Sequence, residues 1–461
     1  MRESARICVS LALAITIASA ARAQEHHHPP AAAPSPEPAP PASPAPAPPA
    51  TTERTLFQSD MTLMAGMTPD DPMAEMAMPQ WHWMTMGMAR LVYNRQGGLS
   101  GGEEVESSNW AMGMGQRDLG RGRLTLMLMS SLEAATLHAG GSPQLFQTGE
   151  TFRGRPLVDH QHPHDFLMNL SATWRRPLGA RAAAWGQAAL RGEPALGPTT
   201  FMHRASAGEN PTAILSHHFQ DSTHITDEVI TLGAGWRGVS VEGSVFHGKE
   251  PDEGRWDLDF GALDSWSARL KLRLGGGWSG QVSHGVLDEP EALNPGDVKR
   301  TTASLHYGER GDRPFAASFV WGRNRESHGT FNGFLLEGAY QATPVDHFYL
   351  RGEQADRDLD LLVFKGGPPV TRVMLNEQGA ALLDRRTSVR ALTLGYLRDL
   401  HRFDEVGPLG PLHVGLAADL TLYDFESLLD ATYGESPLSV HAFLRVRWGA
   451  PHGAGGHAGH Q

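Results

Sequence analysis

The segment "LVDHQHPHDF", residues 157–166, has residue types and a spacing that could bind a metal ion. Three histidines stand at alternate positions between two aspartates, and the five candidate ligands are Asp159, His160, His162, His164 and Asp165. Imidazole and carboxylate are ligands of Cu(II) and Zn(II). Because alternate side chains of an extended backbone point to one side, the spacing predicts that the three histidines bind one ion together.

Two other interpretations of this segment remain open. Its histidines could simply hydrogen-bond to carboxylates within a loop. The residue order is also close to the H-x-H-x-D-H zinc motif of metallo-β-lactamase-like hydrolases, but His164 precedes Asp165 and the strand-helix alternation of those enzymes is absent. Ser216 and His217 are adjacent, yet no complete nucleophile motif is visible, so we expect no enzymatic activity.

A second histidine-rich segment lies at residues 192–226 and contains "FMHRASAGENP" and "SHHFQDSTHIT". Its candidate ligands are His203, His217, His218, Asp221 and His224. Structural and catalytic zinc sites have three or four protein ligands. We therefore expect the two segments to complete one site if the fold brings them together.

Methionines suggest a second, softer class of metal ligand. Thirteen of the 17 methionines lie between residues 61 and 129, and thioether sulfur selects Cu(I) or Ag(I) over hard cations. The candidate Cu(I) ligands are Met61, Met64, Met67, His82, Met84, Met86 and Met88. The alternative is that methionines fill irregular apolar space, which we favour for Met112, Met114, Met127 and Met129.

The elements that must position these residues are β-strands, because hydrophobicity alternates with a period of two. In "SWSARLKLRL", residues 265–274, serine, arginine and lysine alternate with tryptophan, alanine and leucine. Such a strand is apolar on one side and polar on the other. Sixteen segments follow this pattern: 82–94, 108–117, 122–135, 166–176, 181–191, 227–237, 239–248, 265–275, 278–287, 298–308, 314–325, 331–341, 346–355, 388–399, 412–423 and 438–448.

The connections between these strands indicate a transmembrane barrel. They are expected to alternate strictly, long after odd-numbered strands and short after even-numbered ones, as in barrels with short periplasmic turns and longer outer loops. Strands of this length can span a bilayer, and a closed barrel satisfies every backbone polar group. We therefore predict an all-β fold, an antiparallel transmembrane barrel of about sixteen strands, with both histidine segments in outer loops at one mouth.

The chain ends are expected to lie outside the barrel. Residues 1–23 have the basic start, apolar run and Ala-Arg-Ala site of a secretory signal peptide. The predicted order is then a disordered extension at 24–78, rich in proline and alanine and then in methionine, a barrel at 79–449 and a histidine- and glycine-rich tail at 450–461. The formal charge of −12 argues against a nucleic-acid partner. The predicted location is the outer membrane of a Gram-negative bacterium.

Several stretches resemble a known group of proteins: "PLVDHQHPHDFLMNLSATW", "FMHRASAGENP", "HHFQDSTHI", "GSVFHGKEPDEGRWD" and "FVWGRNRES". They are similar to mostly uncharacterised bacterial outer-membrane proteins that are often encoded beside copper and heavy-metal efflux systems. The resemblance implies a metal-resistance setting and a periplasmic metal-efflux system as partner. It supplies no catalytic residues.

The predicted function is an outer-membrane barrel that binds or passes a transition metal, with copper as the favoured ion. Cu(I) would bind the methionines, and Cu(II) or Zn(II) the histidine-rich loops. The alternative is a general porin or a surface-interaction barrel whose histidines are incidental. Its partners would be outer-membrane lipid and metal ions.

Overall fold

The structure is a computed structural model that describes residues 77–449, except residues 139, 293–294, 310 and 366–385. The signal peptide, the proline-rich segment, the histidine-rich tail and the candidate ligands Met61, Met64 and Met67 lie outside the described residues. All described residues belong to one compact unit, Glu53–Gln461. No helix in the described part of the chain is long and apolar enough to cross a membrane.

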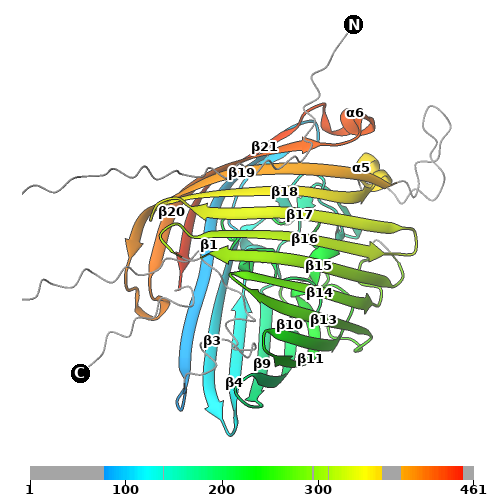
Figure 1. The fold of residues 1–461 in the computed structure, drawn as a ribbon. Helices are drawn as coiled ribbons and strands as arrows, with labels where there is room; N and C mark the ends of the chain where they lie inside the picture. The colour runs from blue at the N-terminus through cyan, green and yellow to red at the C-terminus, as the bar shows by residue number, and fades with distance from the viewer. Residues whose placement is uncertain (1–76, 139, 293–294, 310, 366–385, 450–461) are drawn as a thin grey trace, which may run out of the picture. The chain divides into compact units, whose positions relative to one another are not determined.

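One antiparallel sheet of 17 strands closes into a barrel, because its first strand pairs with both its second and its last (Figure 1). The strands are β1 (His82–Gln96), β2 (Gly102–Glu106), β3 (Asn109–Leu119), β4 (Gly122–Ser130), β9 (Leu167–Pro177), β10 (Ala182–Gly192), β11 (Thr226–Trp236), β12 (Val239–Phe246), β13 (Ser265–Gly275), β14 (Trp278–Leu287), β15 (Val298–Glu309), β16 (Phe315–Arg325), β17 (Thr330–Gln341), β18 (Asp346–Asp358), β19 (Arg386–Phe403), β20 (Leu412–Asp424) and β21 (Leu438–Trp448). Since β2 and β3 pair with successive parts of β1, they share one position around the barrel. The predicted count of sixteen is therefore confirmed.

Three details differ from the sequence prediction. The strand expected at 122–135 ends at Ser130, because α3 (Glu133–Thr136) begins the next connection. An outer loop expected before β3 instead forms β2, which extends the hairpin with β1. Strict alternation of loop length is also wrong, because β16 and β17 are joined by only residues 326–329, a tight turn closed by a hydrogen bond from the Glu326 amide to the Gly329 carbonyl.

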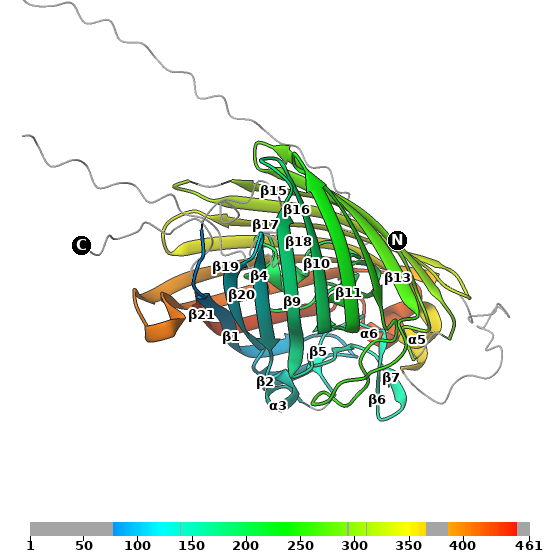
Figure 2. The ribbon, with the colours of Figure 1, turned by 90° about the horizontal axis from the view of Figure 1, so that it is seen from below.

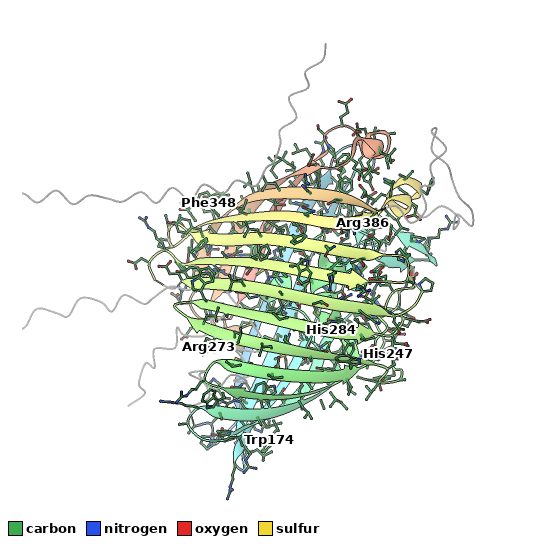
Figure 3. The ribbon with its side chains drawn as sticks, turned by 45° about the vertical axis from the view of Figure 1, so that its right-hand side comes forward. Trp174, His247, Arg273, His284, Phe348 and Arg386 are labelled. Atoms are coloured by element: carbon green, nitrogen blue, oxygen red, sulfur yellow. The ribbon has the colours of Figure 1, made fainter. Side chains whose placement is uncertain are left out.

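The two faces of each strand separate as the period of two predicts. In β4, Leu124, Leu126 and Leu128 point outward, whereas Thr125 and Met127 are buried inside. Large exposed side chains such as Trp174 and Phe348 cover the outer surface (Figure 3). This apolar exterior around a largely polar interior is the pattern of a porin-like barrel in a lipid bilayer.

A closed barrel predicts a simple biochemical result. The purified chain should migrate differently in sodium dodecyl sulfate before and after boiling, because its backbone hydrogen bonds form a ring without an edge. Its circular dichroism should be of the β type. A helical spectrum, or recovery of the chain in the soluble periplasmic fraction, would contradict the barrel.

Residues 193–225, which connect β10 to β11, fold into the barrel, and we call them the lumen loop. The loop contains η1 (Phe201–His203), α4 (His217–Gln220) and η2 (Ser222–His224), and almost all of its side chains are buried. Arginines from distant strands donate hydrogen bonds to its carbonyls: Arg90 of β1 to Gly208, Arg269 of β13 to Gly197, Arg351 of β18 to Thr212 and Arg357 of β18 to Leu215. The lumen loop therefore crosses the interior and is held on several sides.

One glycine of the wall allows α4 to approach closely. A Cβ atom at Gly322 of β16 would lie 2.1 Å from the carbonyl oxygen of Phe219 in α4. No other residue leaves that space free, because a backbone oxygen cannot rotate away as a flexible side chain can. Gly322 thus fixes the depth at which α4 and its two histidines sit.

A second connection, residues 131–166 between β4 and β9, covers the lumen loop. It contains α3 and the short strands β5 (Ser142–Pro143), β6 (Glu150–Phe152), β7 (Arg155–Leu157) and β8 (His160–Gln161). These elements lie at the end of the barrel that also carries α5 (Leu359–Phe364) and α6 (Asp430–Tyr433) (Figure 2). The prediction that both histidine segments meet at one mouth is confirmed, and they meet inside the barrel wall.

Candidate metal centre

Five histidines from the two segments form a continuous row of ring contacts, which we call the histidine cluster. In order they are His162, His218, His217, His224 and His164. Successive ring centroids are 6.5, 5.4, 5.1 and 5.3 Å apart. Three of these histidines come from α4 and η2 of the lumen loop, and two come from the covering connection. The fold therefore brings histidines from both segments together in one cluster.

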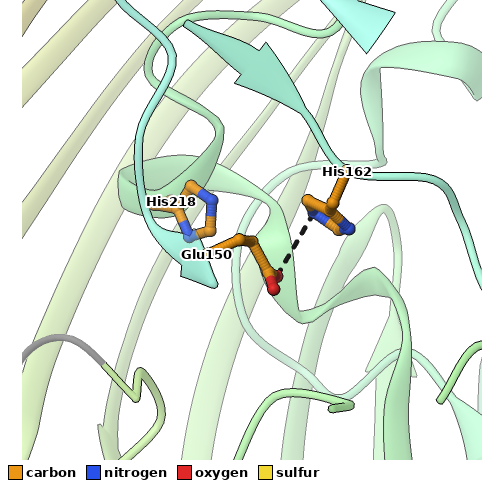
Figure 4. Close-up of side chains that lie close together, drawn as sticks. All are labelled: Glu150, His162 and His218. Carbon is orange, nitrogen blue, oxygen red and sulfur yellow. Dashed lines mark ion pairs between the residues drawn. The ribbon is translucent and has the colours of Figure 1, made fainter. Parts of the chain in front are cut away.

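One group of three side chains comes closest to the geometry of a metal site. It consists of Glu150, His162 and His218. One ligand atom from each lies within 4.8 Å of the others, and the Nε2 atom of His162 is 3.3 Å from the Oε1 atom of Glu150 (Figure 4). Charge-assisted hydrogen bonds are shorter, about 2.7–2.9 Å. Two ligands bound to one tetrahedral zinc ion at about 2.0–2.1 Å lie roughly 3.3 Å apart, so the observed spacing matches shared coordination.

His218 also belongs to a second group of donors, with Glu250 and Glu291. Its Nδ1 atom is 3.3 Å from Glu291 Oε1 and 3.6 Å from Glu250 Oε2. These carboxylates come from the β12–β13 and β14–β15 connections. His218 and its four neighbours thus provide five potential ligands, two imidazoles and three carboxylates, and this mixture suits a borderline divalent ion such as Zn(II) or Cu(II).

The cluster encloses a small cavity of about 20 Å³. Its lining includes Glu150, His162, His218 and Glu250, together with Arg255. A space of this size holds about one water molecule or one ion. The site is therefore too small for an organic substrate but large enough for a bare cation.

The electrostatics of the cluster combine buried carboxylates with one cation, Arg255, which lines the cavity and lies 3.4 Å from Glu150. Burial raises the pKa of Glu150 to about 8 and lowers the pKa of the His162 ring well below its usual value. Burial opposes the charged form of His218, but Glu250 and Glu291 outweigh it and raise the pKa of His218 well above the ordinary value. At neutral pH, the protons bound to Glu150 and His218 therefore offset the negative charge of the buried carboxylates. A bound divalent ion could offset the same charge in their place.

The other three histidines of the cluster have their own polar partners. His217 Nδ1 is 2.8 Å from Asp221 Oδ1, and His164 Nδ1 is 2.7 Å from Glu133 Oε2. His224 Nδ1 faces the carbonyl oxygen of Asp221. Its Nε2 atom is buried without a hydrogen-bond partner among the described residues, so this nitrogen is an additional potential ligand.

The remaining predicted ligands serve other roles, and the three histidines of the "DHQHPHD" segment do not share one side. Strand β8 ends at Gln161, so His160 turns to the carbonyl of Val158 while His162 and His164 enter the cluster. Asp159 accepts a hydrogen bond from the Phe146 amide and pairs with Lys365. Asp165 pairs with two arginines, and His203 packs edge-on against Trp110 at 5.0 Å.

Sequence reasoning missed four carboxylates of the site. They are Glu133, Glu150, Glu250 and Glu291. They lie in three different connections, at no regular spacing from the histidines. The one available signal was that each falls within a long connection at the mouth where the histidines were already expected.

The predicted methionine ligands of β1 lie inside the barrel, apart from the histidine cluster. Met86 and Met88 are buried in an apolar cluster, and Met84 packs against it. His82 is exposed at the start of the strand. The methionines of β1 therefore face the lumen, whereas His82 does not join them in the apolar cluster.

Comparisons with known proteins found similarity to solved barrel structures. No family model matches the chain, and no curated protein matches it. An anion-selective porin from Comamonas acidovorans is 12% identical, with a TM-score of 0.47 over 80% of this chain and 100% of the porin. OprB of Pseudomonas putida is 9% identical, with a TM-score of 0.48 over 80% of this chain and 94% of OprB. The outer-membrane channel DcaP of Acinetobacter baumannii is 9% identical, with a TM-score of 0.41 over 80% and 97% of the two chains. Function must therefore be argued from the residues of this chain.

Proposed function

We propose that this chain is an outer-membrane barrel that binds a divalent transition metal, Cu(II) or Zn(II), in its lumen. His162, His218 and Glu150 are the protein ligands, and a fourth position is left for water or for a neighbouring carboxylate. The observation that carries the proposal is the 3.3 Å separation of His162 Nε2 and Glu150 Oε1, with His218 in reach of both. Copper is favoured, since Cu(II) binds nitrogen and oxygen sites more tightly than Zn(II) does.

The proposed setting is metal homeostasis or resistance, with a periplasmic efflux system as partner. Its support is the sequence resemblance to barrels encoded beside such systems and the methionines that accompany the histidines. The histidine cluster and the methionines of β1 lie inside the same barrel. The barrel would then sequester metal or guide its passage.

The second candidate is a general porin whose histidines are incidental. The closed, porin-like barrel with a polar interior favours it. A loop that only narrows a pore, however, does not require four buried imidazole rings and a half-buried one around a cavity of ionic size. Metal binding by the purified barrel separates the two functions.

The decisive experiment is titration of the purified full-length barrel with Zn(II) and with Cu(II). The double substitution His162→Gln and His218→Gln should weaken binding by on the order of 100-fold or more, because two of three protein ligands are lost. The matched control is His160→Gln, which changes the same motif but a ring outside the cluster. That variant should bind like the parent. Equal binding by all three proteins would reject the metal centre in favour of the porin.

A further inference from the structure

The inner faces of β1, β3 and β4 carry a regular array of methionines. Backbone pairing places Met86 opposite Met112, and Met112 opposite Met129. One step along the same strands, it places Met84 opposite Met114, and Met114 opposite Met127. We call these two rows of three residues the methionine grid.

The rows bring thioethers from adjacent strands together. Side chains directly opposite each other in an antiparallel pair have Cβ atoms about 4.5–5.5 Å apart. Five of the six methionines are buried, and Met84 is half-buried. Each row can therefore offer two or three sulfur atoms to one point inside the barrel.

Apolar packing alone does not explain the choice of methionine. In β4, leucine stands at the three outward positions 124, 126 and 128, whereas methionine stands at the inward positions 127 and 129. Leucine fills an apolar core with better-defined rotamers than methionine. The chain thus uses leucine towards lipid and methionine towards the lumen within one strand.

The grid also differs from the rest of the barrel wall. The inward positions of β12, for comparison, are Ser240, Glu242, Ser244 and Phe246, without a methionine. The cluster that contains the grid also includes Phe201 and Ile225 of the lumen loop. Phe201 packs edge-on against His217 at 6.1 Å, and Ile225 follows His224. The grid therefore adjoins the histidine cluster through shared neighbours but uses another class of ligand.

We propose that the methionine grid is a second metal site, specific for a soft monovalent cation, Cu(I) or Ag(I). Thioether sulfur is a neutral, soft ligand that prefers these ions to Zn(II). This inference goes beyond the proposed function, because it needs neither the histidine cluster nor a divalent ion. Its ligands also extend to Met112, Met114, Met127 and Met129, which the sequence alone favoured as packing residues.

The test is Ag(I) binding to the full-length barrel, with X-ray absorption to identify the ligand atoms. Silver is used because it does not change oxidation state during the measurement. Of the six methionines at residues 61–78, before the barrel, five could also bind silver, so the reference protein carries leucine at residues 61, 64, 67, 73 and 76 and keeps the buried Met78. We expect the reference protein to bind Ag(I) through sulfur.

In that background, the triple substitution Met86→Leu, Met112→Leu and Met129→Leu should lower the amount of Ag(I) bound through sulfur, because it removes one of the two rows and leaves only the row of Met84, Met114 and Met127. Exchange of methionine for leucine nearly conserves volume, so the barrel should still assemble. The matched control is Met78→Leu, a buried methionine outside the grid. Zn(II) binding should be unchanged in every variant, which separates this site from the histidine cluster. If the triple variant binds Ag(I) like the reference, or if silver is bound through nitrogen, the proposal is wrong.

Discussion

Substitution of Arg204 by methionine is expected to release the lumen loop and to increase the conductance of the barrel in a planar bilayer. Arg204 is buried and donates hydrogen bonds to Asp221 at 2.9 Å and to Glu337 of β17 at 2.6 Å. Removal of its guanidinium takes the nearest cation from two buried carboxylates, which keep His217 beside Asp221 and Arg351 at 3.7 Å from Glu337. Breaking a buried ion pair in this way costs about 3–5 kcal/mol.

Loss of the Arg204 ion pairs should destabilise the position of the lumen loop rather than the barrel. The strands are held by a closed ladder of backbone hydrogen bonds that Arg204 does not join. Movement of the loop removes the contacts by which it crosses the lumen, so ions gain a wider path. Boiling-dependent gel mobility should stay as in the parent, which shows that the barrel has assembled.

Arg390→Met is the matched control for lost charge. Arg390 also pairs with a carboxylate, Asp424 at 3.0 Å, but both side chains are about half exposed. Exposed ion pairs contribute only about 0–1 kcal/mol. This variant should conduct like the parent. Unchanged conductance of Arg204→Met would show that the loop does not depend on this buried pair.

The barrel was predictable from sequence because its pattern is local. Alternation in "SWSARLKLRL" depends only on the two faces of a strand, and β13 (Ser265–Gly275) has the predicted bounds. His284 follows the same alternation of faces, although it is a histidine among apolar outward residues. It shares the face of Val282, and it lies outward beside Trp266 at 6.0 Å (Figure 3).

The metal centre was predictable only in part because its ligands are far apart in sequence. Alternate spacing suggested that His160, His162 and His164 act together, but strand β8 ends at Gln161, so the extended backbone does not continue through all three residues. Glu250 and Glu291 reach His218 only because three loops converge inside the barrel. The period of hydrophobicity predicts each strand from its own residues. Convergence of the loops, in contrast, depends on long-range contacts such as those of Arg204 and Arg357.

Gly322→Val should have the largest effect on metal binding of any single substitution outside the ligands. The new Cβ would lie 2.1 Å from the Phe219 carbonyl oxygen, a contact that forces α4 away from β16. Because α4 carries His217 and His218, its displacement separates His218 from Glu150 and His162. Affinity for Zn(II) should fall by on the order of 100-fold, the upper range for loss of a group that positions a metal ligand.

Valine is a favourable residue in a strand, so the barrel itself should form. Gly308→Val in β15 is the matched control, since nothing lies within 4 Å of a Cβ atom built there. Titration calorimetry with Zn(II) compares the two variants, and boiling-dependent mobility confirms assembly of each. We expect Gly308→Val to bind like the parent. Parent-like affinity in Gly322→Val as well would mean that α4 is not seated against β16, and the position assigned to His218 would then be wrong.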